Sequence, residues 1–146
     1  FRDSIDIGNI TMNKVLTVFP FGNYVITKSV KGSDIVKALE LGFSNYPSPS
    51  GGLSQIAGMT CTIDSKAAAG SRVASVVIEG KPIDLEKEYV LATNDFVASG
   101  GDGYDMIAKS KTVNEFSGLD EIISAYIKKI SPIKEEILLP NNIIIK

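Results

Sequence analysis

Apolar residues recur at the three-and-four spacing of an amphipathic helix in three stretches of the chain. The first stretch covers residues 10–18 and ends where Phe19 precedes a proline, a position that disfavours helical backbone. The second begins at Ser33, the expected N-cap, and ends at Gly42. The third covers residues 119–130 and carries the strongest apolar stripe. The pattern therefore predicts three helices of several turns.

Other stretches alternate apolar and polar residues with a period of two, as half-buried strands do. The alternation predicts strands at residues 23–30, 59–63, 72–78 and 82–91, a hairpin turn at 79–81, and an edge strand at 143–145. Helices and strands mix without a regular βαβ order. We therefore expect an α+β fold, with a single domain in which a mixed sheet is packed with helices.

Composition narrows the class of protein. A chain of 146 residues, 44% hydrophobic and 22% charged, has the size and composition of one folded domain. Its formal net charge of −2 provides no basic surface, so we expect no nucleic acid partner. No apolar run is long enough for a membrane span. The single cysteine, Cys61, alternates with threonines, and we expect it in the core, with a reactive thiol as the alternative.

The chain contains no histidine and only one cysteine. A histidine-based catalytic triad, a histidine-ligated zinc site and a cysteine cluster are therefore excluded. Carboxylate-only sites for magnesium or calcium remain open, but no acidic loop of the EF-hand type is present. We expect no catalytic residue, metal site or cofactor in this chain.

Residues 93–104, with the sequence TNDFVASGGDGY, form a glycine-rich segment that we expect to be a loop. Its glycines let the backbone approach a ligand closely. Phe96 offers a face for stacking, and Asp102 offers a carboxylate that accepts hydrogen bonds from hydroxyl groups. These groups suit a nucleoside, and the alternative is a glycine-rich turn with a buried phenylalanine. The spacing fits neither a Walker loop nor a dinucleotide fingerprint.

A second motif, VFPFGN at residues 18–23, places Phe21 near Asn23 ahead of a predicted strand. A base has two π faces, so Phe21 and Phe96 can enclose one, each stacking contact contributing roughly 1–3 kcal/mol. Asn23 can both donate and accept, so its side chain can read the edge of a purine. From the residues alone, either phenylalanine could instead belong to the core.

Together the two motifs resemble the C-terminal domain of the 5'-nucleotidase family, which includes secreted nucleotidases, UDP-sugar hydrolases and 2',3'-cyclic-nucleotide phosphodiesterases. FPFGN and the pattern N-D-F-x-A-x-G-G-D-G recur in that family at about this separation. FRDSID at residues 1–6 resembles the end of the family's Asn-Gly-Gly-x-Arg motif, and GGLSQ at 51–55 resembles its Gly-x-x-x-Gln segment. The resemblance covers residues 1 to about 108, and it implies that residues 1–146 form a nucleotidase C-terminal domain.

The resemblance also implies individual roles in substrate binding. It assigns the clamping of a base to Phe21 and Phe96, base contacts to Asn23 and Gly51, ribose binding to Asp102 and phosphate binding to Arg2. The chain departs from the family pattern at several points. The Asn-Gly-Gly portion and a further upstream arginine are missing, some members carry glycine at the position of Asn23, and the doublet Gly51-Gly52 leaves the register open.

A longer enzyme is the final implication of the resemblance. An N-terminal metallophosphoesterase domain, absent from this chain, would hold two divalent metal ions and hydrolyse the phosphate ester. This chain, which starts without methionine inside a family motif, would be an excised fragment without activity of its own. The family further implies an extracellular, periplasmic or cell-wall location.

Two other functions stay open from the sequence. A stand-alone binding module for a protein partner would use exposed phenylalanines as hot spots. A parent enzyme that acts on cyclic nucleotides, UDP-sugars or NAD would use the same clamp, because all of these substrates carry a base.

Overall fold

The computed structural model describes residues 2–53, 55–134 and 142–146. Phe1 and Ser54, which belong to the motifs quoted above, lie outside the described residues. The helices are α1 (Met12–Val18), α2 (Gly32–Gly42), α3 (Asp95–Ala98), α4 (Asp105–Ala108) and α5 (Leu119–Ile130), with a 3-10 turn η1 (Gly101–Gly103). The strands are β1 (Tyr24–Lys31), β2 (Met59–Ile63), β3 (Val73–Ile78), β4 (Lys81–Pro82), β5 (Glu88–Asn94), β6 (Lys111–Gly118) and β7 (Ile143–Ile145).

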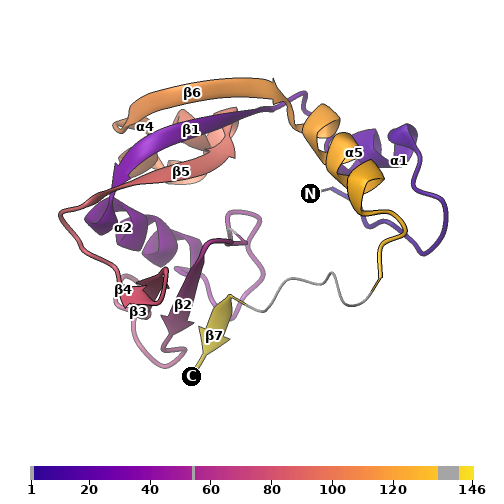
Figure 1. Cartoon of the computed structure of the whole chain (residues 1–146). Coiled ribbons are helices and arrows are strands. Elements are labelled where there is room, and N and C mark those ends of the chain that lie inside the picture. Colours follow the sequence, from indigo (N-terminus) through magenta and orange to yellow (C-terminus); the bar gives the residue numbers. More distant parts are fainter. Residues whose placement is uncertain (1, 54, 135–141) are drawn as a thin grey trace.

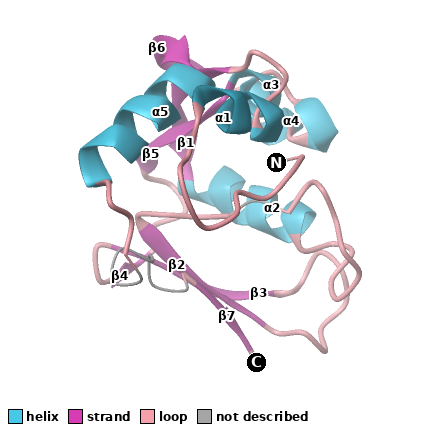
Figure 2. Ribbon diagram, turned by 90° about the vertical axis from the view of Figure 1, so that its right-hand side faces the viewer, coloured by secondary structure: helices cyan, strands magenta, loops and turns pink. Residues whose placement is uncertain are grey.

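The strands form two sheets on opposite sides of α2 (Figures 1 and 2). In the first sheet, β1 lies between β5 and β6 and is antiparallel to both. The second sheet has the order β4-β3-β2-β7, and only its β2–β7 pair is parallel. Helices α1 and α5 pack side by side beyond one end of the first sheet (Figure 1). This arrangement confirms the predicted α+β fold.

One hydrophobic core joins the two sheets through α2. Ile35 and Leu39 of this helix are buried, with Val30 of β1 on one side and Cys61 and Ile63 of β2 on the other. These residues belong to the apolar positions of the predicted patterns. The core therefore forms where the apolar stripe of the helix meets the inward residues of both sheets.

Cys61 lies in this core, as expected, and its side chain is inaccessible to solvent. Burial raises the pKa of the Cys61 thiol to about 11, with a smaller contribution from the nearby Glu40 carboxylate. Because the thiolate is the reactive form, a protonated and buried thiol argues against the reactive alternative.

The N-terminus of α2 is not capped by Ser33, so that prediction was wrong. The helix begins at Gly32, and the N-cap residue Lys31 makes no side-chain cap. Instead, the amides of Gly32 and Ser33 donate to the main-chain carbonyls of Lys87 and Leu85, each at 2.9 Å. A distant backbone segment thus provides the acceptors that a cap residue usually supplies.

The C-terminus of α2 is also held by distant residues. The Arg72 guanidinium donates to the carbonyl oxygens of Phe43 and Ser44, just past the helix end. The Glu40 carboxylate accepts from the main-chain amides of Arg72 and Val73, at 2.9 and 2.7 Å. These contacts tie the last turn of α2 to the start of β3.

The prediction of one continuous strand at residues 82–91 is wrong, because only Pro82 and residues 88–91 are in strands and the chain changes sheets between them. β4 ends at Pro82, residues 83–87 form a loop, and β5 begins at Glu88 in the other sheet. This loop contributes the carbonyls that bind the N-terminus of α2. A single straight strand would not bring them there.

The hydrophobic pattern did not predict β6. Seven of its eight residues are exposed, so no alternation marks it as a strand. It forms because its backbone pairs with β1 at the edge of the first sheet. The elements predicted at 10–18, 23–30, 59–63, 119–130 and 143–145 are confirmed, with bounds that differ by two residues at most.

Gly32 offers a test of this packing. A Cβ atom at Gly32 would overlap the carbonyl oxygen of Asp84. Glycine to alanine inside a helix usually stabilises by about 1 kcal/mol. Here we expect Gly32→Ala to lower the free energy of unfolding by about 1–3 kcal/mol, because the loop must move away. Denaturant unfolding measures this difference.

The matched control is Gly51→Ala, since an added Cβ at Gly51 would meet no atom within 4 Å. Its free energy of unfolding should stay within about 0.5 kcal/mol of the parent chain. A Gly32→Ala chain as stable as the parent would contradict the close approach of the loop.

Candidate functional site

A cavity of about 710 Å³ lies where α1, α3, the start of α5 and two loops meet. Its volume is within the usual range of small-molecule sites, roughly 300–1,000 Å³. All the residues assigned above to substrate binding line it: Arg2, Phe21, Asn23, Gly51, Phe96 and Asp102. The remaining lining residues are Val18, Phe19, Gly52, Asn94, Val97 and Leu119. The fold thus brings together side chains that lie far apart in the sequence, while their roles stay predictions.

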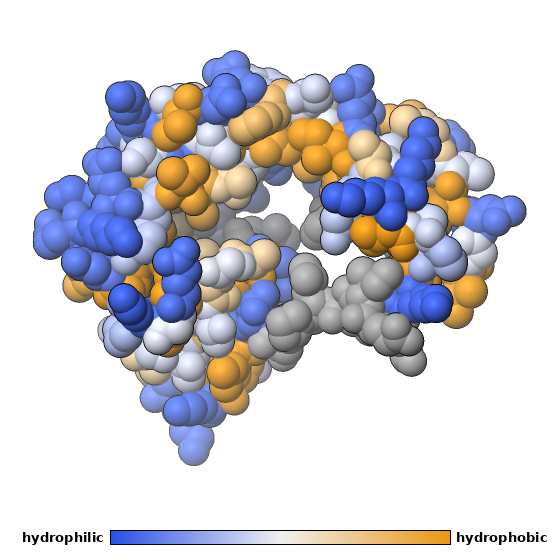
Figure 3. All heavy atoms as spheres, viewed as in Figure 1, coloured by the Kyte–Doolittle hydropathy of each residue, from blue (hydrophilic) through white to orange (hydrophobic). Residues whose placement is uncertain are grey.

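The space-filling view shows that the molecule is hollowed between the part that contains α2 and the part that contains α1 and α5 (Figure 3). Hydrophobic residues border this hollow along its upper rim in that view. The pairing of α1 with α5 contributes Val18 and Leu119 to the cavity wall. The C-terminal end of α1 and the N-terminal end of α5 therefore both form part of the wall.

Two aromatic rings are exposed at the cavity. Phe21 is 64% exposed and Phe96 is 48% exposed, so neither is the buried core residue of the alternative interpretation. Phe21 is followed by Gly22, which has a φ of 63° and turns the chain into β1. Phe96 lies on the short helix α3, although the sequence predicted a loop there. Exposed aromatic faces in a cavity suit a flat ligand.

Gly101 determines where the ring of Phe96 lies. A Cβ atom at Gly101 would overlap three carbons of that ring, so only glycine permits this contact. The glycines of this segment were considered together from the sequence, and no local pattern indicates the contact of Gly101 with the ring. Its structural role is to let the ring lie directly against the backbone of η1.

The N-terminus of α3 is held by polar side chains. Asn94 is its N-cap, and its Oδ1 accepts from the amide of Val97 at 2.8 Å. The Oδ1 of Asp95 accepts from the Nδ2 of Asn23 at 2.7 Å and from the amide of Tyr24 at 3.3 Å. Asn94 and Asp95 thus shape this segment, and Asp95 fastens α3 to the start of β1.

A buried lysine holds the other end of α3. Lys28 of β1 is only 5% exposed, and its Nζ donates to the carbonyl oxygens of Ala98 and Ala108, both at 3.0 Å. These carbonyls lie at the C-termini of α3 and α4, where a positive charge is favourable. In the sequence, Lys28 was one more residue of an alternating strand, so nothing marked its role.

Asp102 lies opposite the Gly51-Gly52 doublet. A Cβ atom placed on Gly52 would be 4.0 Å from the Oδ2 of Asp102, and the aspartate is exposed. Its φ of 54° is in the left-handed region, which costs a non-glycine residue on the order of 1 kcal/mol. Tyr104 is buried, and its hydroxyl donates to the carbonyl of Gly52 at 2.6 Å. This bond fastens the doublet to the segment that carries the aspartate, and both line the cavity.

Arg2 lies over the ring of Phe21, with its Cζ 5.0 Å from the ring centroid. Its main-chain amide donates to the carbonyl of Val18 at 3.1 Å. This cation–π contact covers one face of a ring that is still 64% exposed. The guanidinium is thereby placed on the cavity wall, and its predicted phosphate contact stays a prediction.

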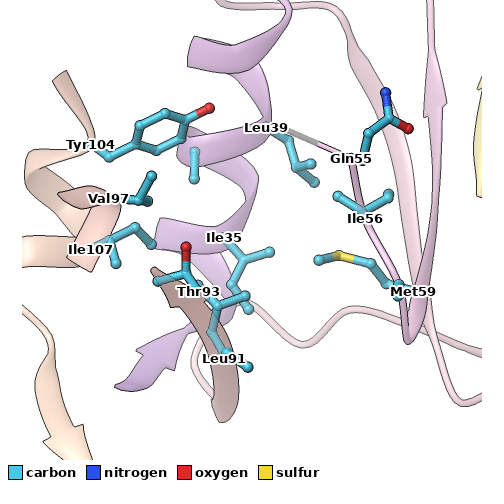
Figure 4. A pocket seen from close by; sticks show the side chains of 13 residues that line it. Ile35, Leu39, Gln55, Ile56, Met59, Leu91, Thr93, Val97, Tyr104 and Ile107 are labelled. Atoms are coloured by element: carbon cyan, nitrogen blue, oxygen red, sulfur yellow. The ribbon is translucent and has the colours of Figure 1, made fainter. Parts of the chain in front are cut away.

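A second, smaller cavity of about 160 Å³ contains none of the predicted site residues (Figure 4). Side chains of α2, β5 and residues 55–59 surround it, among them Ile35, Leu39, Ile56, Met59 and Leu91. Its lining is mostly aliphatic. It is therefore an apolar space in the core and not part of the candidate site.

Metal ligands do not gather in the part of the chain that the structure describes. In the described ranges, no group of three or more histidine, cysteine, aspartate or glutamate side chains is arranged to hold a metal ion. None of the helices in those ranges has the length and apolar character that crossing a membrane requires.

Comparison with known proteins identifies a family. The model of the 5'-nucleotidase C-terminal domain matches residues 1–109. The protein UshA of Yersinia enterocolitica is 41% identical over 133 residues, which are 90% of this chain and 23% of that protein. The trifunctional nucleotide phosphoesterase YfkN of Bacillus subtilis is 36% identical over 135 residues, which are 88% of this chain and 9% of that protein. The chain thus spans less than a quarter of the length of these two relatives.

Solved structures show the same fold. The 5'-nucleotidase precursor of Thermus thermophilus matches with a TM-score of 0.90 and 33% identity, over 99% of this chain and 29% of that one. The NAD nucleotidase of Haemophilus influenzae matches with a TM-score of 0.76 and 27% identity, over 95% of this chain and 27% of that one.

Lys28 provides the test of how the site is supported. We expect Lys28→Met to lower the free energy of unfolding by about 1–3 kcal/mol, because two carbonyl oxygens lose a buried donor. Denaturant unfolding followed by circular dichroism measures the loss. The matched control is Lys31→Met on the same strand, where the lysine forms an exposed ion pair with Glu86. The control should change stability by about 0.5 kcal/mol at most, and an equal loss in both variants would contradict the role of Lys28.

Proposed function

The chain belongs to the 5'-nucleotidase family, whose C-terminal domain it represents, and we propose on that premise that it holds the nucleoside part of the substrate. The proposal is carried by one observation. Six residues singled out in the sequence, from Arg2 to Asp102, line a single cavity of ligand size.

The groups on the cavity wall match the parts of a nucleotide. Phe21 and Phe96 present exposed aromatic faces, on which a base can stack. The Asp102 carboxylate can accept hydrogen bonds from the two neighbouring hydroxyls of a ribose. Arg2 brings a guanidinium, which suits a phosphate, to the same wall. Asn23 and the backbone at Gly51 complete the contacts to the base in this proposal.

Hydrolysis would take place in another part of a longer protein. We assign it to an N-terminal metallophosphoesterase domain with two divalent metal ions, which would activate water against the phosphate ester. The described residues of this chain include no cluster of side chains suited to a metal ion, so no step of the reaction is assigned to them. The contribution of this chain is binding and orientation. By analogy with the family, we place the parent protein outside the cytoplasm, in an extracellular, periplasmic or cell-wall location.

Two alternatives differ in their ligands. One similar structure is an NAD nucleotidase, which makes NAD, like a cyclic nucleotide or a UDP-sugar, a candidate substrate of the parent enzyme. The second alternative is a protein-binding surface centred on Phe21 and Phe96. Competition by free adenosine distinguishes these alternatives. Adenosine would displace any ligand that binds through a base, but it would not displace a protein partner.

Binding of nucleosides is the direct test. We expect adenosine and AMP to bind saturably in ligand-observed NMR, with a Kd on the order of 1 mM, which corresponds to about 4 kcal/mol. Phe96→Ala should weaken binding about fivefold or more, because a stacking contact contributes roughly 1–3 kcal/mol. Phe116→Ala is the matched control, since Phe116 is also 48% exposed but does not line the cavity.

Either of two results would contradict the proposal. One is the absence of saturable binding up to several times the expected Kd. The other is an equal effect of Phe96→Ala and Phe116→Ala, which would separate the phenylalanine on α3 from the binding of the base.

The purified chain should not hydrolyse AMP. With magnesium, manganese or zinc added, we expect phosphate release at the rate of the blank, because the chain provides no cluster of metal ligands among its described residues. A colorimetric phosphate assay measures the rate. Metal-dependent release above the blank, surviving repeated purification, would show that catalytic groups reside in this chain.

A further inference from the structure

The side-chain amide of Asn23 is held in one orientation. Its Nδ2 donates to the Oδ1 of Asp95 at 2.7 Å, in a partly buried position. The same carboxylate oxygen accepts from the amide of Tyr24 at 3.3 Å. A carboxylate oxygen accepts and does not donate, so the group of Asn23 that faces it has to be the NH₂ group. The orientation of the amide thus follows from the chemistry of its partner.

This orientation determines what Asn23 offers to a ligand. Asn23 lines the large cavity, whereas Asp95 does not. One hydrogen of its Nδ2 is therefore engaged on the side of α3, and the fixed orientation places the acceptor Oδ1 on the other side of the amide. An amide free to rotate would present a donor or an acceptor as the ligand required. The amide of Asn23, held by Asp95, keeps its acceptor in one place.

The side-chain amide of Asn94, also on the cavity wall, is held through its oxygen and not through its nitrogen. Asn94 uses its Oδ1 to accept from the amide of Val97 at the N-terminus of α3. Its Nδ2 is the part that remains, and an NH₂ group only donates. The wall that includes Asn23 and Asn94 therefore offers one acceptor and one donor. The amino group and the neighbouring ring nitrogen of adenine or cytosine have the complementary order.

We propose that Asp95 is a positioning residue through which this cavity selects bases with an exocyclic amino group, adenine and cytosine, over the matching keto bases, hypoxanthine and uracil. The inference rests on the proposed function, because it needs a base between the two phenylalanines. An amino group donates to the Oδ1 of Asn23. A keto oxygen at the same place would face another acceptor and lose its partner.

The stacking and ribose contacts in the cavity do not make this distinction. Stacking on Phe21 and Phe96 tolerates every base, because every base has a π face. A ribose bound at Asp102 has the same hydroxyls whatever the base is. The edge of the base is thus the part that can be distinguished, and the locked amide of Asn23 is the group that faces it in this proposal.

The test compares nucleosides that differ at this edge, where a keto base replaces the amino group by an oxygen and the neighbouring ring nitrogen acceptor by an N–H donor. The dissociation constants of adenosine and inosine, and of cytidine and uridine, are measured by ligand-observed NMR on the parent chain. We expect a preference of about tenfold for each amino nucleoside, the size that corresponds to one lost hydrogen bond with its unpaired acceptor.

Two variants at Asp95 separate positioning from general support of the fold. Asp95→Asn keeps an oxygen that accepts from Tyr24 and from the Nδ2 of Asn23, so the preference should remain. Asp95→Ala removes that acceptor and frees the amide, so the preference should fall to about twofold or less. A purely structural role would weaken all four nucleosides alike and leave the ratio unchanged. Asn23→Ala, which removes the selecting oxygen itself, should also abolish the preference.

The outcomes distinguish this inference from the proposed function. Equal affinity of the parent chain for adenosine and inosine, or an unchanged ratio in Asp95→Ala, overturns the inference while nucleoside binding stands. A ratio that persists in Asn23→Ala overturns it as well, and this variant serves if Asp95→Ala does not fold. Absence of binding for all four nucleosides overturns both the inference and the proposed function.

Discussion

The structure depends on how helix α2, buried between two sheets, satisfies the hydrogen-bonding groups at its ends. Backbone carbonyls of the loop at residues 83–87 accept from its first amides, and Arg72 donates to the carbonyls that follow its last turn. Buried backbone groups without partners would destabilise the fold by an amount comparable to its whole free energy of unfolding. Because the loop has to pass the start of α2, the chain leaves the second sheet after β4 and enters the first as β5. β5 then ends at Asn94, beside the cavity.

The candidate site is carried by elements that are too short to be stable alone. Helix α3 has only four residues, far below the length at which an isolated helix is stable in water. Polar contacts hold it at both ends: its N-cap Asn94 and the Asp95–Asn23 bond at the start, and the buried ammonium of Lys28 at the finish. Because α3 is held at both ends, the exposed ring of Phe96 keeps its position. A site formed in advance loses less conformational entropy when a ligand binds.

The proposed function separates binding, in this chain, from chemistry in another domain. A domain that holds a base and a sugar can be combined with one active site or serve several phosphate esters, because the fold does not dictate the reaction. The similar structures agree with this view, since they include a 5'-nucleotidase precursor and an NAD nucleotidase that share the fold of this chain. Under the proposed function, selection among bases depends on a few polar atoms at the base edge, while stacking supplies affinity for all of them.

The sequence by itself determined the elements and residues whose signals are local. The helix at residues 119–130 and the strand at 59–63 were predictable, because an apolar face of the right period marks them. The two phenylalanine motifs were recognisable because each is contained in a short segment of the sequence. Only the tertiary structure decided the loop that caps α2, the strand β6 without a buried face, and the partners of Lys28 and Asn23. Asn23 and Asp95 are 72 residues apart, and a hydrogen bond over that separation leaves no periodic trace in the sequence.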